Sequence, residues 1–414
     1  MKITSVTLKN FRGFKNLQLD LHPAFNIIIG INGTGKTAIL EGLKIASGSL
    51  MLGMDKVKDK LYSPGIDKKN DVHQQNFEKQ WPVTIIGDGH IFSEQIHWSR
   101  ELNGEKNNTT TKNAYGIWKF SEQIQEEVKE GRTNLILPLI AFFSINRFKI
   151  EKSEDKNIEA YGSRLRGYYN SLDEQTTMKF FRNLFRTETL GALQEGKQSE
   201  MLLCVENAVR SCISDCRKVY HHVKSDELVI EFTDERTLPF RLLSEGVRIT
   251  LAMAMEIAFR CYLLNGKKLG LDSTAQTTGI VLIDEIDLHL HPSWQKKVVQ
   301  DFSKTFPSIQ FVATTHSPLV IGSLLKGKIH ALKDAQIFSI PSLYGKDANT
   351  ILIEMDAEER LPEIKALLNK YYILIENGRG KEPEALQIRT QLGELIGQSD
   401  TELQKADIML SFFE

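Results

Sequence analysis

The chain has 414 residues, a formal net charge of −1 and 41% hydrophobic residues, which suggests a globular protein of two to three domains at about 150 residues per domain. It has no uninterrupted apolar span of about 20 residues and no secretion signal, which excludes a membrane-spanning transporter for this polypeptide and predicts a cytoplasmic protein. The near-neutral charge argues against extensive wrapping of nucleic acid by the monomer.

A glycine-rich loop, residues 30–37, is the most specific feature of the chain. It follows the apolar run 25–29 and precedes a helical pattern over residues 38–43, and this order of strand, loop and helix predicts a P-loop. Glycines let backbone N–H groups converge on phosphate oxygens at the positive end of a helix. Lys36 is expected to reach the β- and γ-phosphates, and the Thr37 hydroxyl to bind Mg²⁺. The residues expected to contact the nucleotide here are Asn32, Gly33, Thr34, Gly35, Lys36 and Thr37.

Residues 51–134 predict an insertion followed by an antiparallel β lobe. The segment 51–80 is polar and contains a Pro-Gly turn at residues 64–65. Its lysines alternate with aspartates, which indicates a solvated loop or, as the alternative, a phosphate-contacting patch. Within residues 81–120, glycine-containing turns separate short strands expected at residues 83–86, 91–92 and 95–98.

A buried core strand is predicted over residues 135–143. Because its end should face the nucleotide, Arg147 is expected to contact the γ-phosphate or to couple the lobes. Residues 164–224 have helical spacing without a sustained heptad repeat, which predicts a compact helical lobe and argues against chromosome tethering. A further strand is expected over residues 228–232.

Two more strands end in residues suited to nucleotide chemistry. Residues 279–283 lead to Asp284 and Glu285, and the carboxyl end of a buried strand is where an α/β sheet presents ligand-contacting residues. Asp284 is expected to hold Mg²⁺ and Glu285 to polarise the attacking water. Residues 310–314 lead to His316, which is expected to hydrogen-bond the γ-phosphate or the attacking water.

Ser244 begins an amphipathic helix. Considered alone it is an ordinary N-cap. At this place in the order of motifs, however, Ser244 and Gly246 resemble the signature motif of the ABC-type ATPases. The resemblance implies that both residues close over the γ-phosphate of a partner subunit. Glu245 and Val247 stand where transporters usually carry glycine and glutamine, so the details of this contact stay open.

The chain is expected to be helical from Glu358 to its last residue, with breaks near residues 377–380 and 397–400. Its apolar stripes predict either internal core or a small helical appendage for oligomer or partner contact. A Toprim-like nuclease domain does not fit in this space, and we expect no nuclease activity of the chain itself.

Together the motifs resemble the RecF, SMC and OLD branch of ABC-type ATPases, and within it the PtuA-type ATPases of Septu and some retron anti-phage systems. The resemblance rests on residues 9–14, 30–37, 166–168, 243–246, 284–292, 315–317 and 344–352. It implies an α/β fold, with an ABC-type ATPase head of mixed sheet and P-loop, an antiparallel β lobe, a helical lobe and a C-terminal helical appendage. It also implies that Arg12 lies near the nucleotide. The expected parts are the head at 1–50, the insertion and β lobe at 51–134, a core strand at 135–150, the helical lobe at 151–225, the rest of the head at 226–356 and the appendage at 357–414.

The resemblance further implies an ATPase with ATP and Mg²⁺ as cofactors. It implies head-to-head dimers, larger homo-oligomers and control of an HNH nuclease of the PtuB type. Two alternatives are the ATPase of another defence pair, such as PARIS with its Toprim effector, and a RecF-type repair ATPase that clamps DNA. The sequence leaves several properties open. They are the trigger, the oligomer number, the identity of the effector, the direction of its control by ATP, the hydrolysis rate and DNA contact through the assembly.

Overall fold

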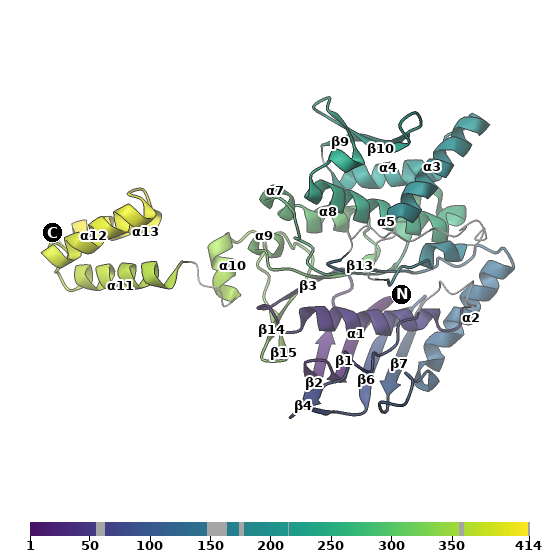
Figure 1. Ribbon diagram of the computed structural model, residues 1–414, viewed down its shortest axis with the longest axis horizontal. Coiled ribbons are helices and arrows are strands. Elements are labelled where there is room, and N and C mark those ends of the chain that lie inside the picture. The colour runs from purple at the N-terminus through teal and green to yellow at the C-terminus, as the bar shows by residue number, and fades with distance from the viewer. Residues whose placement is uncertain (55–62, 147–163, 174–177, 214, 356–359, 413–414) are drawn as a thin grey trace. The chain divides into compact units, whose positions relative to one another are not determined.

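The computed structural model describes residues 1–54, 63–146, 164–173, 178–213, 215–355 and 360–412. The chain divides into two compact units, Met1–Lys346 and Asp347–Glu414 (Figure 1). The second unit includes α10 (Ala348–Glu354) and therefore begins before residue 357, where the sequence periodicity suggested its start. Among the described residues, no helix has the length and apolar character needed to cross a membrane.

A six-stranded mixed sheet, in the order β15-β14-β3-β13-β12-β8, forms the centre of the first unit. Its strands are β3 (Phe25–Ile29), β8 (Leu139–Phe143), β12 (Gly279–Ile283), β13 (Ile309–Thr314), β14 (Gly327–Lys333) and β15 (Gln336–Ile340). Neighbouring strands are parallel except for the antiparallel pair β14–β15. The runs in β3, β12 and β13 are buried throughout, as expected for strands covered on both faces. The predicted α/β class is confirmed, and these three strands end at one edge of the sheet.

An antiparallel sheet in the order β2-β1-β6-β7 lies on the other side of the P-loop helix. Its strands are β1 (Lys2–Phe11), β2 (Phe14–Asp20), β6 (Val83–Ile91) and β7 (Glu94–Leu102). The helix α1 (Lys36–Gly48) lies between the two sheets in Figure 1 and is almost entirely buried. The indole N–H of Trp98 donates to the carbonyl of Ala46 at 3.0 Å, which joins β7 to the end of α1.

The three short strands expected between residues 83 and 98 are two long strands. Gly87 and Gly89 lie inside β6, because both allow close packing. A Cβ at Gly87 would lie 2.5 Å from the Trp98 ring, and a Cβ at Gly89 would lie 2.3 Å from the carbonyl oxygen of Lys2. The chain reverses instead after β6, where Phe92 has a φ of 54°.

A helix, α2 (Tyr115–Lys129), replaces the expected continuation of the β lobe to residue 120. Ile117, Phe120 and Ile124 recur at helical spacing and are buried. The helix packs against β7 and the short 3-10 helix η1 (Ser49–Met51). The apolar residues of this segment therefore follow helical spacing, and the strand pattern of the preceding residues does not continue into it.

The helical lobe contains α3 (Met178–Glu195), α4 (Glu200–Cys212) and the long α5 (Glu245–Leu269). It also contains a three-stranded sheet of β11 (Thr237–Pro239), β10 (Glu227–Phe232) and β9 (Cys216–His222). The expectation of helix up to residue 224 is therefore wrong for β9. Because Cys216, Val219 and His221 are buried while the residues between them are more exposed, the strand covers the lobe with one face.

Buried polar contacts join α5 to the segment of η4 (Arg164–Tyr168) and to the segment before β8. Arg260 is fully buried, and its Nη2 lies 2.6 Å from Oε1 of Glu256. Its Nη1 donates to the carbonyls of Gly167 and Tyr169 at 2.8 and 2.9 Å. Asn265 accepts from the N–H of Leu137 at 2.8 Å, so the segment before β8 bonds to α5, and the core strand starts at residue 139 rather than 135.

Short elements complete the first unit. Those around the sheets are β4 (Gln74–Gln75), β5 (Glu78–Lys79), η2 (Lys112–Ala114), η4 (Arg164–Tyr168), η5 (Phe240–Leu242) and η6 (Gly270–Asp272). The short helices are α6 (Ser273–Gln276), α7 (Pro292–Gln295), α8 (Val298–Thr305) and α9 (Pro318–Ile321).

The second unit packs three longer helices, α11 (Pro362–Glu376), α12 (Pro383–Ile396) and α13 (Thr401–Phe412). Arg389 binds the carboxylate of Asp407 through Nε and Nη2, at 2.8 and 2.7 Å, which ties α12 to α13. The internal core of this unit is made of Leu368, Tyr371, Leu374, Ile375, Ala385, Ile388, Leu392, Leu403 and Ala406. The predicted apolar stripes contribute to it in part: Ile364, Leu367, Met409 and Leu410 pack against it partly buried, whereas Leu361, Leu386 and Leu395 are exposed.

Candidate nucleotide-binding site

The predicted P-loop connects β3 to α1 and contains three glycines with positive φ, Gly30, Gly33 and Gly35. Gly35 has a φ of 106°, and a Cβ there would lie 2.7 Å from the ring of Phe14, so only glycine fits. The Lys36 ammonium donates to the carbonyls of Gly30 and Ile31 at 2.8 and 3.0 Å. The lysine side chain thus folds along its own loop, and its contact with a triphosphate stays a prediction.

Lys36 is also part of a charged cluster. Burial lowers the pKa of its ammonium, and the nearby carboxylates of Asp284, Glu285 and Asp287 oppose that shift. One cation is therefore surrounded by the acidic residues that follow β12. The arrangement joins two motifs that are far apart in the sequence.

Thr37 and Asp284 come together as the sequence predicted for a metal site. The Thr37 hydroxyl donates to Oδ2 of Asp284 at 2.9 Å, and the Thr314 hydroxyl donates to Oδ1 at 2.6 Å. Asp284 is buried, with 2% of its surface exposed. A hydroxyl and a carboxylate are hard oxygen ligands of the kind that Mg²⁺ prefers, so these residues fit the ion.

Glu285 follows directly and adopts an uncommon backbone conformation. Its φ is 48°, in the left-handed region that non-glycine residues rarely occupy, and such conformations concentrate at functional sites. Its N–H donates to the hydroxyl of Thr314 at 2.7 Å, while the Thr315 hydroxyl donates to Asp287 at 2.5 Å. The end of β13 therefore holds the acidic loop in place through two hydroxyls.

His316 lies between two anchored residues. Thr315 before it is bonded to Asp287, and Ser317 after it caps α9 by accepting from the N–H groups of Leu319 and Val320. His316 itself is half-buried. Its role toward the γ-phosphate stays a prediction, but its backbone position is fixed at the edge of the sheet that carries the P-loop and Asp284.

The start of α5 is also exposed at the surface. Ser244 occupies the N-cap position, is exposed, and its hydroxyl makes no cap hydrogen bond. A Cβ at Gly246 would lie 2.5 Å from the carbonyl oxygen of His289, so α5 packs tightly onto the loop after Glu285. A serine hydroxyl is thus presented outward from a helix N-terminus.

Arg12 and Arg147 are the two remaining residues that were expected near the nucleotide. Arg12 lies in the turn between β1 and β2, where its Nε is 2.7 Å from Asp71, and it lines an open hollow with Lys69 and His73. Because Phe14 of the same hairpin packs on Gly35, this turn lies close to the P-loop, but the proximity of Arg12 to nucleotide stays a prediction. Arg147 lies outside the described residues.

Thr314 has a role that was not predicted from its place in the sequence. Its hydroxyl bonds both Asp284 and the backbone of Glu285, which makes it the residue that orients the acidic pair. A polar residue at the last position of an otherwise apolar strand was the available signal.

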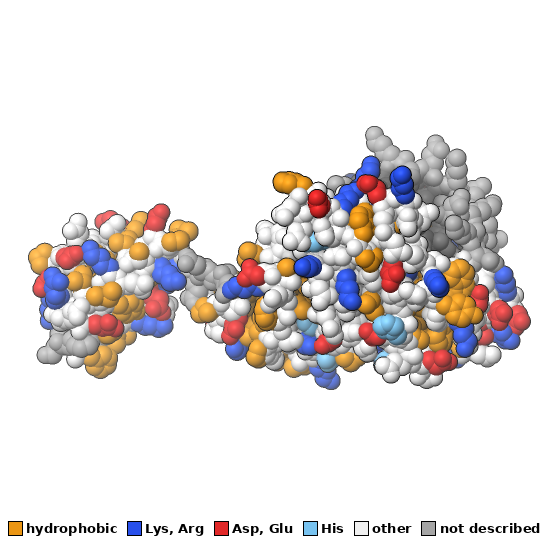
Figure 2. Space-filling model, turned by 90° about the horizontal axis from the view of Figure 1, so that it is seen from below, with side chains coloured by type: hydrophobic (Ala, Val, Ile, Leu, Met, Phe, Trp, Pro, Cys, Tyr) orange, Lys and Arg blue, Asp and Glu red, His pale blue; other side chains and the backbone are white. Residues whose placement is uncertain are grey.

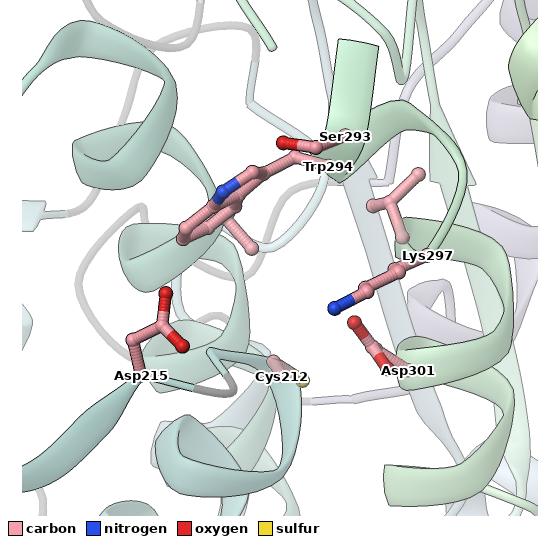
Figure 3. A pocket seen from close by; sticks show the side chains of 8 residues that line it. Cys212, Asp215, Ser293, Trp294, Lys297 and Asp301 are labelled. Atoms are coloured by element: carbon pink, nitrogen blue, oxygen red, sulfur yellow. The ribbon is translucent and has the colours of Figure 1, made fainter. Parts of the chain in front are cut away.

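A pocket of about 110 Å³ lies between the α4–β9 turn, α5 and the α7–α8 segment (Figure 3). Asp215 and the Trp294 ring lie on one side of it in Figure 3, Lys297 and Asp301 lie on the other, and Cys212 lies below between them. Burial raises the pKa of Asp301 to about 6, although Lys297 and Lys304 oppose the shift. The pocket therefore contains a carboxylate that the folded protein holds in a costly charged form at neutral pH.

We expect Asp301→Asn to stabilise the protein at pH 7.5. Unfolded, Asp301 titrates near pH 4, so between pH 4 and 6 the unfolded chain releases a proton that the folded chain keeps, and stability falls as pH rises. After a discount for solvent screening of this half-buried group, the expected gain in the free energy of unfolding is about 1–2 kcal/mol at pH 7.5 and near zero at pH 4. Urea unfolding at both pH values measures it, with Asp215→Asn as the control. Equal gains at the two pH values would contradict the assignment.

The chain matches the family described as "AAA domain" over residues 5–211, half of its length. It also matches "AAA domain, putative AbiEii toxin, Type IV TA system" over residues 112–322. The chain belongs to the AAA domain family. This assignment, together with the hydrogen bond between Thr37 of the loop and Asp284, confirms the prediction that the chain is an ATPase.

Relatives of this AAA domain protein agree with the predicted resemblance. It is 26% identical to "Retron Ec83 probable ATPase" of Escherichia coli, over 97% of this chain and 85% of that protein. It is 23% identical to "Septu protein PtuA" of Bacillus thuringiensis, over 88% and 84% of the two chains. Among solved structures, the SMC head domain from Thermotoga maritima gives a TM-score of 0.45 with 12% identity, over 82% of this chain and 99% of that one. The predicted similarity to retron and Septu ATPases is confirmed.

Proposed function

We propose that the chain is the ATP-binding and ATP-hydrolysing sensor and scaffold of an anti-phage defence complex. ATP and Mg²⁺ are held between two heads, and the assembly controls an associated HNH nuclease. The observation that carries this proposal is the hydrogen bond between Thr37 and Asp284, which supports a metal-assisted triphosphate site in a chain whose relatives are named as retron and Septu proteins.

The second head would supply Ser244 and Gly246. The exposed Ser244 hydroxyl makes no cap hydrogen bond and is available to an acceptor from outside the helix. A helix N-terminus favours anions, so α5 is suited to a γ-phosphate held by a partner's P-loop. Glu285 would then activate water only when both heads are in place.

The C-terminal unit is suited to oligomer or nuclease contact. Residues 347–414 contain fourteen Asp and Glu against seven Lys and Arg, whereas the remainder of the chain has a basic excess. Its exposed apolar side chains include Ile373, Leu395, Ile408 and Phe412. Orange apolar side chains are visible on this unit in Figure 2. On the face of the first unit seen in Figure 2, basic and acidic side chains are interspersed, which favours a protein partner over DNA for the isolated chain.

Purification of the tagged chain from its native host tests the proposal. An HNH nuclease recovered in stoichiometric amount, identified by mass spectrometry, is the expected result. Recovery of the chain alone with DNA would overturn the defence scaffold in favour of a repair clamp. Light-scattering mass with and without ATP tests the dimer, and an identical mass in both conditions would count against the sandwich.

A further inference from the structure

The first residue of α5 brings a carboxylate to the place where a partner's triphosphate would dock. Glu245 follows Ser244 directly, and its side chain is 49% exposed. Its Oε2 lies 3.6 Å from Nδ1 of His289, whose side chain is 46% exposed. An acid and an imidazole thus face each other at the surface beside the outward-facing serine.

Both members of this pair are fixed by their backbones. The close approach of Gly246 to the carbonyl of His289 holds the start of α5 against the loop. His289 has a φ of 61°, and the turn around it is closed by hydrogen bonds of 3.0 Å from Leu288 N–H to the Glu285 carbonyl and from Leu290 N–H to the Asp287 carbonyl. The imidazole is therefore positioned by the same loop that carries Glu285.

A carboxylate at this position works against an ATP sandwich. The helix N-terminus attracts phosphate, but Glu245 places a like charge in the first turn. At separations of about 6–8 Å and an effective dielectric constant near 20, one such repulsion corresponds to about a thirtyfold to hundredfold weaker association, which solvent screening of the exposed carboxylate reduces to about tenfold. The imidazole of His289, 3.6 Å from the carboxylate, is placed to draw it away from a docking phosphate.

We propose that Glu245 and His289 set how tightly one head closes over the nucleotide of a second copy. Glu245 opposes closure, and His289 draws the carboxylate aside and permits it. This inference rests on the proposed ATP sandwich. Neither side chain is expected to touch the nucleotide bound in its own subunit, so both act as positioning residues for the contact in trans.

The test uses the full chain carrying Glu285→Gln, with ATP and Mg²⁺, and measures the dimer dissociation constant by sedimentation. Adding Glu245→Gln should tighten the dimer about tenfold, and adding His289→Ala should weaken it about tenfold. A chain that carries both Glu245→Gln and His289→Ala should have the dissociation constant of Glu245→Gln alone, because no carboxylate is left for His289 to draw aside. The ATP affinity of the dilute monomer and the thermal midpoint should stay unchanged in each variant. Glu94→Gln, at the exposed first residue of β7, controls for the loss of one negative charge.

The outcomes separate the two claims. Equal dissociation constants in all variants would overturn the pair while leaving the sandwich intact. A combined variant as weak as His289→Ala would also overturn it, because His289 would then act without Glu245. If the Glu285→Gln chain stays monomeric at saturating ATP, the proposed sandwich fails and the inference fails with it.

Discussion

Replacing Lys36 with alanine is expected to abolish ATP binding. In the proposed site the ammonium would donate charged hydrogen bonds to the β- and γ-phosphates, and losing two of them would cost about 3–5 kcal/mol, or more than a hundredfold in affinity. The carboxylates of Asp284, Glu285 and Asp287 near Lys36 would then face the triphosphate without a compensating cation, which adds to the loss. Calorimetric titration with a slowly hydrolysed ATP analogue measures the effect, and steady-state hydrolysis should disappear with it.

The folded state of this variant must be checked independently. Lys36 is buried and donates to two loop carbonyls, so the loop itself is expected to relax while the sheets stay intact. Lys9→Ala, which removes an exposed lysine from β1, is the matched control and should bind ATP as the wild type does. A Lys36→Ala chain with a native thermal midpoint and tenfold or smaller loss of affinity would show that the loop binds triphosphate through its backbone alone.

The nucleotide site was largely predictable because its residues lie at the ends of strongly apolar strands. Residues 25–29, 279–283 and 309–314 are buried runs of the kind that form the centre of a parallel sheet, and parallel strands present their carboxyl ends at one edge. The strand pattern therefore predicted that Lys36, Thr37 and Asp284 lie close together. Thr314 was not predicted because it acts by orienting neighbouring residues, and no sequence motif marks such a role.

The peripheral elements were less predictable because long-range packing decides them. Gly87 and Gly89 have the sequence appearance of a turn, yet the Trp98 ring and the β1 backbone occupy the space beside them. The segment of β9 is short and contains two histidines, and its strand conformation depends on pairing with β10. Arg12 forms an ion pair with Asp71, and no periodic pattern in the sequence predicts this contact.

Replacing Glu285 with glutamine is expected to slow hydrolysis by about two to three orders of magnitude without loss of ATP binding. Glutamine keeps the shape of the side chain but cannot accept the proton of the attacking water, and a positioned general base is worth about 10²–10⁴ in rate. The backbone should stay in place, because the N–H of residue 285 still donates to Thr314. Rapid-quench measurement of a single turnover isolates the chemical step.

The same variant should accumulate the ATP-bound assembly. If hydrolysis in the sandwich releases the two heads, a chain that binds but does not cleave ATP must stay associated, and its light-scattering mass should remain that of the larger species long after wild type has returned to the smaller one. Glu94→Gln should behave as wild type in both rate and mass. If Glu285→Gln still hydrolyses ATP at the wild-type rate, the base must be another group at this edge, and His316, fixed between Thr315 and Ser317, becomes the residue to replace next.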